Sequence, residues 1–121
     1  MKRPTYRELN RKIEQAKETV SKKIIVLDPE VIAIDALELG YEIKDLKSIL
    51  SELLSSITPK HYAGTYPPQK SYEEDILNQE LFAFKVISGR FGCEIYVKYV
   101  LEEDSFWLVS LHQHREKEQG T

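Results

Sequence analysis

The sequence has 121 residues, a length typical of one domain with one hydrophobic core. Its 17 Lys and Arg residues are outnumbered by 20 Asp and Glu residues, so any nucleic-acid site has to be a local basic patch. No apolar run approaches the roughly 20 residues that span a bilayer. The charged N-terminal region also lacks the apolar centre of a signal peptide, so we expect a cytosolic protein.

The N-terminal half predicts three helices, because apolar residues recur there at three- and four-residue spacing. The first helix begins in the capping-box pattern of residues 5–8 and ends near Ser21. The second, over residues 28–40, opens with an Asp-Pro pair and stops at a glycine. The third runs over residues 43–56. Between the first two helices, the apolar run 24–27 is either a short strand or an extended connector.

Residues 58–75 predict a long loop, because prolines and a glycine interrupt any regular element there. A loop of this length in a compact domain is often functional. Its tyrosines Tyr62, Tyr66 and Tyr72 either pack over the helices or stack on unpaired bases of a nucleic acid.

From Glu80 onward the hydrophobic period changes to two, which predicts a three-stranded antiparallel meander. Its turns are expected at residues 88–92 and 103–105, and a polar tail follows Arg115. The predicted fold is therefore α+β and a single domain over residues 1–121. Its N-terminal helices are expected to pack on one face of a C-terminal antiparallel sheet of three or slightly more strands.

Side chains paired across antiparallel strands point to the same face, so matching the apolar residues predicts the register. The apolar residues expected to face the helices are Phe82, Phe84, Val86, Cys93, Ile95, Val97, Tyr99, Leu101, Trp107, Val109 and Leu111. This matching sets Leu101 opposite Trp107 across a three-residue turn. It likewise sets Tyr99 opposite Val109.

The opposite face of the predicted sheet then receives polar side chains from all three strands. A row of Lys85, Tyr96 and His112 is expected to cross it. Other residues on or beside this face are Gln79, Lys98, and Glu94 opposite His114. A solvated sheet face presents the same residue types, so the pattern alone fits a site or a plain surface.

Five short motifs occur in order along residues 28–115: DALELGY at 35–41, KHY at 60–62, LNQELF at 77–82, EIYVK at 94–98 and WLVSLH at 107–112. In their order and spacing they resemble the MqsR-type toxins, which belong to the broader RelE-like mRNA interferase group. The resemblance implies a RelE-like fold and metal-independent cleavage of mRNA, on or off the ribosome. It also implies a cognate antitoxin protein as a partner.

Four residues match the active-site pattern of this family. Gln79 matches the family's glutamine, and Tyr62 matches the tyrosine of its loop. Tyr96 and Lys98 match its Tyr-x-Lys strand motif. On this resemblance Gln79 orients the substrate and Tyr96 takes part in catalysis.

Two positions depart from the family's pattern. His112 stands where a lysine commonly ends the last strand, and Ala63 stands where a catalytic lysine usually follows the tyrosine. A histidine titrates near neutrality and can still serve in catalysis. Lys85, from the neighbouring strand, is the candidate substitute for the missing cation.

Metal-independent RNA cleavage needs a base for the 2′-OH, cations for the phosphoryl oxygens and an acid for the leaving 5′-oxygen. His112 is the candidate base or acid. Tyr96, with a reference pKa of about 10, is a better acid or hydrogen-bond donor than base. The candidate substrate-binding residues are Lys98, Arg90, Arg115, Tyr62 and His114. We expect no metal or cofactor, because the histidines lack helical i,i+4 spacing or a cysteine cluster.

The sequence thus favours a toxin-like endoribonuclease with RNA as substrate and an antitoxin as partner, without a membrane role. An alternative keeps the same fold but has no catalysis, and binds a protein partner or RNA. The acidic balance, Ala63 and His112 favour that alternative.

Overall fold

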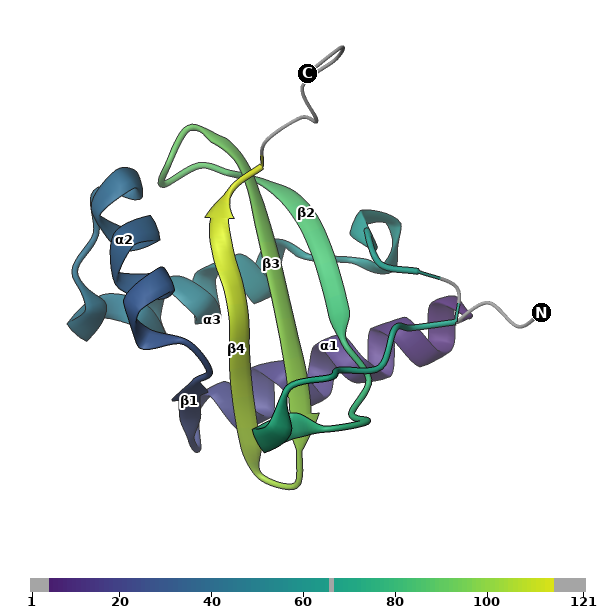
Figure 1. The fold of residues 1–121 in the computed structure, drawn as a ribbon. Helices are drawn as coiled ribbons and strands as arrows, with labels where there is room; N and C mark the ends of the chain where they lie inside the picture. Colours follow the sequence, from purple (N-terminus) through teal and green to yellow (C-terminus); the bar gives the residue numbers. More distant parts are fainter. Residues whose placement is uncertain (1–4, 66, 115–121) are drawn as a thin grey trace, which may run out of the picture.

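The computed structural model describes residues 5–65 and 67–114 and shows an α+β fold with three helices and a four-stranded sheet (Figure 1). The helices and strands, in chain order, are α1 (Tyr6–Val20), β1 (Ile24–Val26), α2 (Pro29–Leu39), α3 (Leu46–Ser56), β2 (Phe82–Ser88), β3 (Cys93–Glu102) and β4 (Ser105–Gln113). Short 3₁₀ turns are η1 (Ile43–Asp45), η2 (Pro59–His61) and η3 (Glu74–Ile76). The helices and the three C-terminal strands occur where the sequence predicts them.

The starts of α1 and α2 follow from local capping chemistry. The Thr5 side chain accepts a hydrogen bond from the Glu8 backbone N–H at 3.1 Å, and the Glu8 carboxylate accepts one from the Thr5 N–H at 2.8 Å. Asp28 accepts a hydrogen bond from the Val31 N–H at the start of α2. At its end Gly40 has a φ of 85°, the left-handed conformation that favours glycine.

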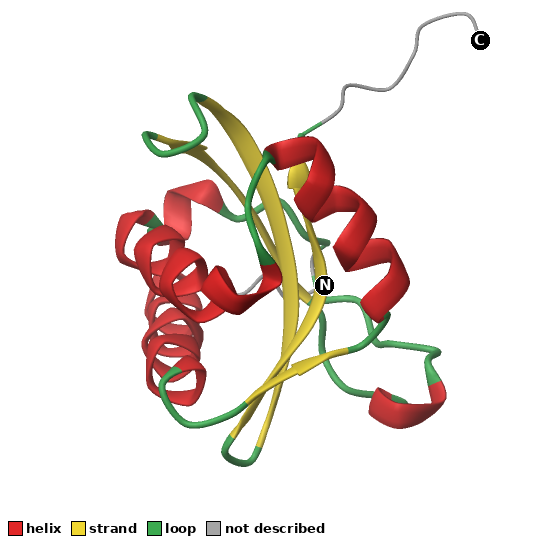
Figure 2. Cartoon of the chain, turned by 90° about the vertical axis from the view of Figure 1, so that its left-hand side faces the viewer, coloured by secondary structure: helices red, strands yellow, loops and turns green. Residues whose placement is uncertain are grey.

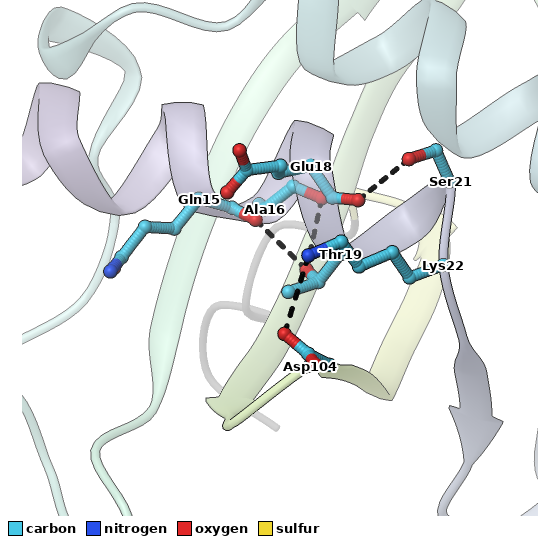
Figure 3. A network of polar contacts seen from close by, with 7 residues as sticks. All are labelled: Gln15, Ala16, Glu18, Thr19, Ser21, Lys22 and Asp104. Carbon is cyan, nitrogen blue, oxygen red and sulfur yellow. Dashed lines mark hydrogen bonds and ion pairs between the residues drawn. The ribbon is translucent and has the colours of Figure 1, made fainter.

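The end of α1 is tied to the turn between β3 and β4 (Figure 3). The buried Thr19 hydroxyl donates hydrogen bonds to the carbonyls of Gln15, at 2.9 Å, and Ala16, at 3.1 Å. Lys22 then reaches Asp104 of the turn, with 3.4 Å between Nζ and Oδ1. Both partners of this ion pair are exposed, so it contributes at most about 1 kcal/mol to stability.

The strand order is β1-β4-β3-β2, and β2, β3 and β4 form the predicted antiparallel meander. β1 adds a parallel strand along the outer edge of β4, with Ile24 opposite Phe106 and Val26 opposite Leu108. The sheet is therefore mixed, and the expectation of a purely antiparallel sheet is wrong at this edge. Without β1, β4 would be an edge strand with unpaired backbone N–H and C=O groups. The run 24–27 supplies the strand that pairs with these groups.

The sequence predicted that all the helices pack on one face of the sheet, and this prediction is wrong for α2. α1 and α3 cover one face, whereas α2 lies beside β4 on the opposite side (Figures 1 and 2). Only Leu27 and Asp28 separate β1 from α2, so this helix has to begin at the edge of the sheet. It buries Ile32 and Ala36 there.

The predicted register between β3 and β4 is confirmed in one half and wrong in the other. Tyr96 lies opposite His112, as predicted. Leu101 and Tyr99, however, lie opposite Phe106 and Leu108 rather than Trp107 and Val109. The turn has two residues instead of three, with a positive φ of 53° at Glu103.

A β-bulge restores the predicted register farther along β4. The register shifts between Lys98 and Tyr99, because Val109 is an extra residue between the partners Leu108 and Ser110. Phe106 and Leu108 are therefore fully buried, whereas Trp107 and Val109 are only partly buried. The shorter turn and the bulge cancel each other, so the side chains beyond the bulge lie on the predicted faces.

The hydrophobic core lies between the sheet and helices α1 and α3. The ring of Tyr99 is at its centre, 4.9 Å from the Phe106 ring and 6.0 Å from the Phe84 ring. The helices contribute buried residues that include Leu9, Ile13, Ala16, Ile49, Leu50, Leu53 and Leu54. Burial of this apolar surface is the main driving force of the fold.

The other face of the sheet is open over only part of its length. The segment carrying η3 lies in front of the end of the sheet near the β3–β4 turn (Figures 1 and 2). Ile76 of this segment is buried, as are Ala83 and Val100 of the sheet. Accessible polar side chains are thus concentrated toward the far end, where β3 begins and β4 ends.

Tyr41 provides a test of how the region after α2 is packed. Its ring lies against Phe91, with 5.9 Å between ring centroids, and its buried hydroxyl has no hydrogen-bond partner among the described residues. A buried hydroxyl without a partner costs free energy. At neutral pH, Tyr41→Phe is therefore expected to leave the free energy of unfolding unchanged or raise it by up to about 1 kcal/mol in urea titrations.

The same variant should also change the stability at high pH. Burial, and to a smaller extent the Asp35 carboxylate, raises the pKa of Tyr41 from 10.0 to about 12. The folded protein thus keeps this proton where the unfolded chain has released it. The free energy of unfolding is therefore unaffected by this ionisation below pH 10 and falls as the pH rises to 12. Wild-type stability should fall more steeply than that of Tyr41→Phe in this window. Parallel curves would contradict the assignment.

Candidate functional site

A row of polar side chains crosses the three strands of the meander on the face away from α1 and α3. Lys85 of β2 lies opposite Tyr96 of β3, which in turn lies opposite His112 of β4. Together with Ala63 and His114 they line a pocket of about 250 Å³, named here the row pocket. The prediction that Lys85, Tyr96 and His112 share one face is confirmed.

The aromatic rings of Tyr96 and His112 stack against each other in this pocket. Their centroids are 5.3 Å apart and their planes are inclined by 27°. Stacking limits rotation of the imidazole ring and so fixes its orientation. Burial raises the pKa of the Tyr96 hydroxyl above its usual value, so this group stays protonated at neutral pH and acts as a hydrogen-bond donor.

A backbone hydrogen bond sets the tautomer of His112. Its Nδ1 lies 2.8 Å from the carbonyl oxygen of Gln113. A carbonyl can only accept, so Nδ1 carries the hydrogen and donates it. The neutral ring then has its lone pair on Nε2, which is free to accept a proton from a substrate.

His114 continues the ladder between β3 and β4 by one step. Its backbone N–H donates to the Glu94 carbonyl at 2.8 Å, which confirms the predicted pairing of these two residues. Its Nε2 lies 3.9 Å from the Glu94 carboxylate, a distance at which a protonated imidazole forms an ion pair. The row pocket therefore contains two imidazoles with different neighbours.

Two lysines give this face a local positive charge. Lys85 lines the row pocket, and Lys98 lies two residues from Tyr96 on the same face, opposite Ser110 and Ala83. These lysines are the positive charges that this face offers to an anionic ligand, and the Glu94 carboxylate lies beside His114 on the same face.

The structure places three of the other candidate residues away from the row pocket. Arg90 pairs with Glu52 of α3, with 2.6 Å between Nε and Oε1. Tyr62 packs against Phe84 on the helix-covered face, with 5.7 Å between ring centroids. Gln79 lies in the loop before β2, where its backbone is hydrogen-bonded to Ile76 and Ser71. Arg115 and Tyr66 lie outside the described residues.

Ala63 contributes to the row pocket through its backbone position. Its N–H donates to the Ala83 carbonyl at 2.8 Å, which attaches the loop to the edge of β2. The sequence singled out this position only through the family resemblance, as the site of a missing lysine. Among the described residues that line the pocket, Lys85 is then the one that carries a lysine or arginine charge.

Within residues 5–65 and 67–114, no helix is both long and apolar enough to cross a membrane. The same residues contain no cluster of three His, Cys, Asp or Glu side chains arranged to hold a metal ion. Comparison with protein-family models, with curated proteins and with solved structures gave no match for this chain.

Proposed function

We propose that the row pocket cleaves single-stranded RNA without a metal ion, by attack of a ribose 2′-OH on the adjacent phosphorus. The observation that carries the proposal is the fixed tautomer of His112 beside Lys85 and Tyr96. These residues supply a base, a cation and a protonated hydroxyl at one small opening. The base and the cation are two of the groups that metal-independent RNA cleavage requires, and the hydroxyl adds a hydrogen-bond donor for the phosphate.

Each side chain has one role in this proposal. His112 Nε2 removes the proton from the 2′-OH, because its Nδ1 is held by the Gln113 carbonyl. The Lys85 ammonium stabilises negative charge on the phosphoryl oxygens, and the Tyr96 hydroxyl donates a hydrogen bond to one of them. Lys98 binds a neighbouring phosphate on the same face.

The substrate class and the partner come from the sequence resemblance to the MqsR-type, RelE-like toxins. On that basis the substrate is mRNA, free or on the ribosome, and a cognate antitoxin protein binds and inhibits this chain. Gln79 orients RNA in that family pattern, so in this chain it would contact the substrate outside the row pocket.

A second candidate is a RelE-like domain that binds a protein or RNA without cleaving it. Ala63 favours this function, because it lines the pocket with a methyl group where the family pattern has a lysine. The two candidates differ in one measurable property, which is whether the pure protein breaks RNA.

The proposal is tested by incubating the protein with a defined single-stranded RNA in excess EDTA. Wild type should cleave, and Lys85→Gln should lose about 10²–10³-fold in rate because the phosphoryl charge is left without its cation. Lys44→Gln, an exposed lysine paired with Glu42 outside the row pocket, is the matched control and should cleave like wild type. Absence of cleavage by wild type would overturn the proposal and favour the binding domain.

A further inference from the structure

We infer that His114 is the general acid of this reaction and that Glu94 positions its imidazole ring. The inference rests on the proposed function, but it assigns a role that neither the resemblance nor the strand pattern gives to His114. It follows from two imidazoles lining one pocket with different polar neighbours.

The spacing of the two histidines suits an in-line displacement. They lie two residues apart in an extended segment, so their backbones are roughly 7 Å apart and their side chains project to the same face. The His114 N–H keeps this geometry by its bond to the Glu94 carbonyl. Attacking and leaving oxygens lie on opposite sides of phosphorus, and this separation leaves room for one phosphate between base and acid.

The two rings have different polar neighbours. The His112 ring is held by the Gln113 carbonyl and stacks on Tyr96, so its Nε2 carries the lone pair that a base needs. The Nε2 of His114 lies 3.9 Å from the Glu94 carboxylate, which is an ion-pair partner for the imidazolium that a general acid needs. A base and an acid at one pocket are the two members of an acid–base pair.

Tyr96 also has a proton to give, in addition to the Lys85 ammonium that stabilises the phosphoryl charge. Burial makes its hydroxyl a weaker acid than a free tyrosine. An imidazolium gives up its proton near neutral pH and is therefore the more effective donor to the leaving oxygen. Tyr96 keeps its role as a hydrogen-bond donor to the phosphate.

The complete step transfers two protons and exchanges one bond to phosphorus. The 2′-OH gives its proton to His112 Nε2 as the 2′-oxygen bonds to phosphorus. The bond from phosphorus to the 5′-oxygen breaks, and that oxygen takes a proton from the His114 imidazolium. The products are a 2′,3′-cyclic phosphate and a 5′-hydroxyl, and both histidines return to their starting states by proton exchange with water.

The test uses two RNA substrates that differ at one atom, the 5′-oxygen of the scissile bond or a sulfur in its place. A thiolate leaves without protonation, since thiols have a pKa of about 8.5. His114→Gln should lose about 10²–10⁴-fold on the oxygen substrate and recover to near the wild-type rate on the sulfur substrate. His112→Gln should lose activity on both substrates. His61→Gln, at the histidine whose ring lies beside Thr58 in the loop, is the matched control.

Each alternative result has a distinct meaning. An equal loss of His114→Gln on both substrates, or no loss on the oxygen substrate, would overturn the role of His114 and leave the proposed function intact. A wild type that cleaves neither substrate would instead overturn the proposed function itself.

Glu94 is tested separately, because it acts through His114. Glu94→Gln should reduce cleavage of the oxygen substrate, since the His114 ring loses the carboxylate that positions it. The sulfur substrate should show no such reduction. Equal rates of Glu94→Gln and wild type on the oxygen substrate would remove Glu94 from the assignment.

Discussion

Replacing His112 with glutamine is expected to reduce RNA cleavage by about 10²–10⁴-fold, the contribution of a well-placed general base. The imidazole is oriented by stacking on Tyr96 and by its bond to the Gln113 carbonyl, so no neighbouring side chain occupies the same position. Glutamine keeps a polar side chain of similar size at this partly buried position, and the fold should be retained. The measurement is the single-turnover cleavage rate, alongside thermal unfolding of both proteins.

The matched control for this prediction is again His61→Gln. His61 lies in the loop, where its Nδ1 accepts a hydrogen bond from the Thr58 N–H, an interaction that the glutamine side-chain oxygen can replace. The control should cleave RNA like wild type. A His112→Gln protein that is folded and cleaves at the wild-type rate would show that the base is another group.

Replacing Phe84 with alanine is expected to lower the free energy of unfolding by about 3–5 kcal/mol. Phe84 is fully buried and packs between the rings of Tyr99, at 6.0 Å, and Tyr62, at 5.7 Å. Its removal leaves a cavity where the sheet, α3 and the loop around η2 meet, and these elements cannot all move to fill it. The loss is a large part of the 5–15 kcal/mol typical of a domain of this size, and urea titration measures it.

Ile87→Ala is the matched control in the same strand. Ile87 projects to the opposite face and is 75 % exposed, so its truncation should change stability by no more than about 0.5 kcal/mol. Similar losses for both variants would contradict the placement of the core on the side of α1 and α3.

The parts of the fold that the sequence predicts correctly have local causes. The capping box at Thr5 and Glu8 and the Asp-Pro pair at the start of α2 are complete within four residues. The meander follows from hydrophobic alternation between recognisable turns. The sequence also predicted correctly that one face of the sheet carries Lys85, Tyr96 and His112. Hydrophobic pairing across neighbouring strands determines which side chains share a face.

The position of the bulge could not be predicted in the same way. Four consecutive residues of β4, from Phe106 to Val109, are apolar, so alternation does not distinguish the two faces there. The correct register depends on a two-residue turn and an extra residue at Val109, which together leave the far half of the strand unchanged. The row pocket lies in that half, and its predicted geometry was therefore correct.

Non-local contacts account for the other differences. The pairing of β1 with β4 joins segments about 80 positions apart in the chain, and no short pattern in residues 24–27 specifies it. The same pairing places α2 on the other side of the sheet. The family pattern or the residue type assigned three further residues to the site: Gln79, Tyr62 and Arg90. The folded loops place all three away from the row pocket, and no sequence pattern indicates this.

The central claim is that the row pocket uses the substrate's own 2′-OH as nucleophile, and one substrate pair tests it most directly. The pair consists of a single-stranded RNA and the same RNA with one 2′-deoxynucleotide at the cleavage position, both in excess EDTA. We predict that wild type converts the first into fragments ending in a 2′,3′-cyclic phosphate and a 5′-hydroxyl and leaves that bond of the second intact. Cleavage of the deoxy-substituted bond at the same rate would contradict the claim.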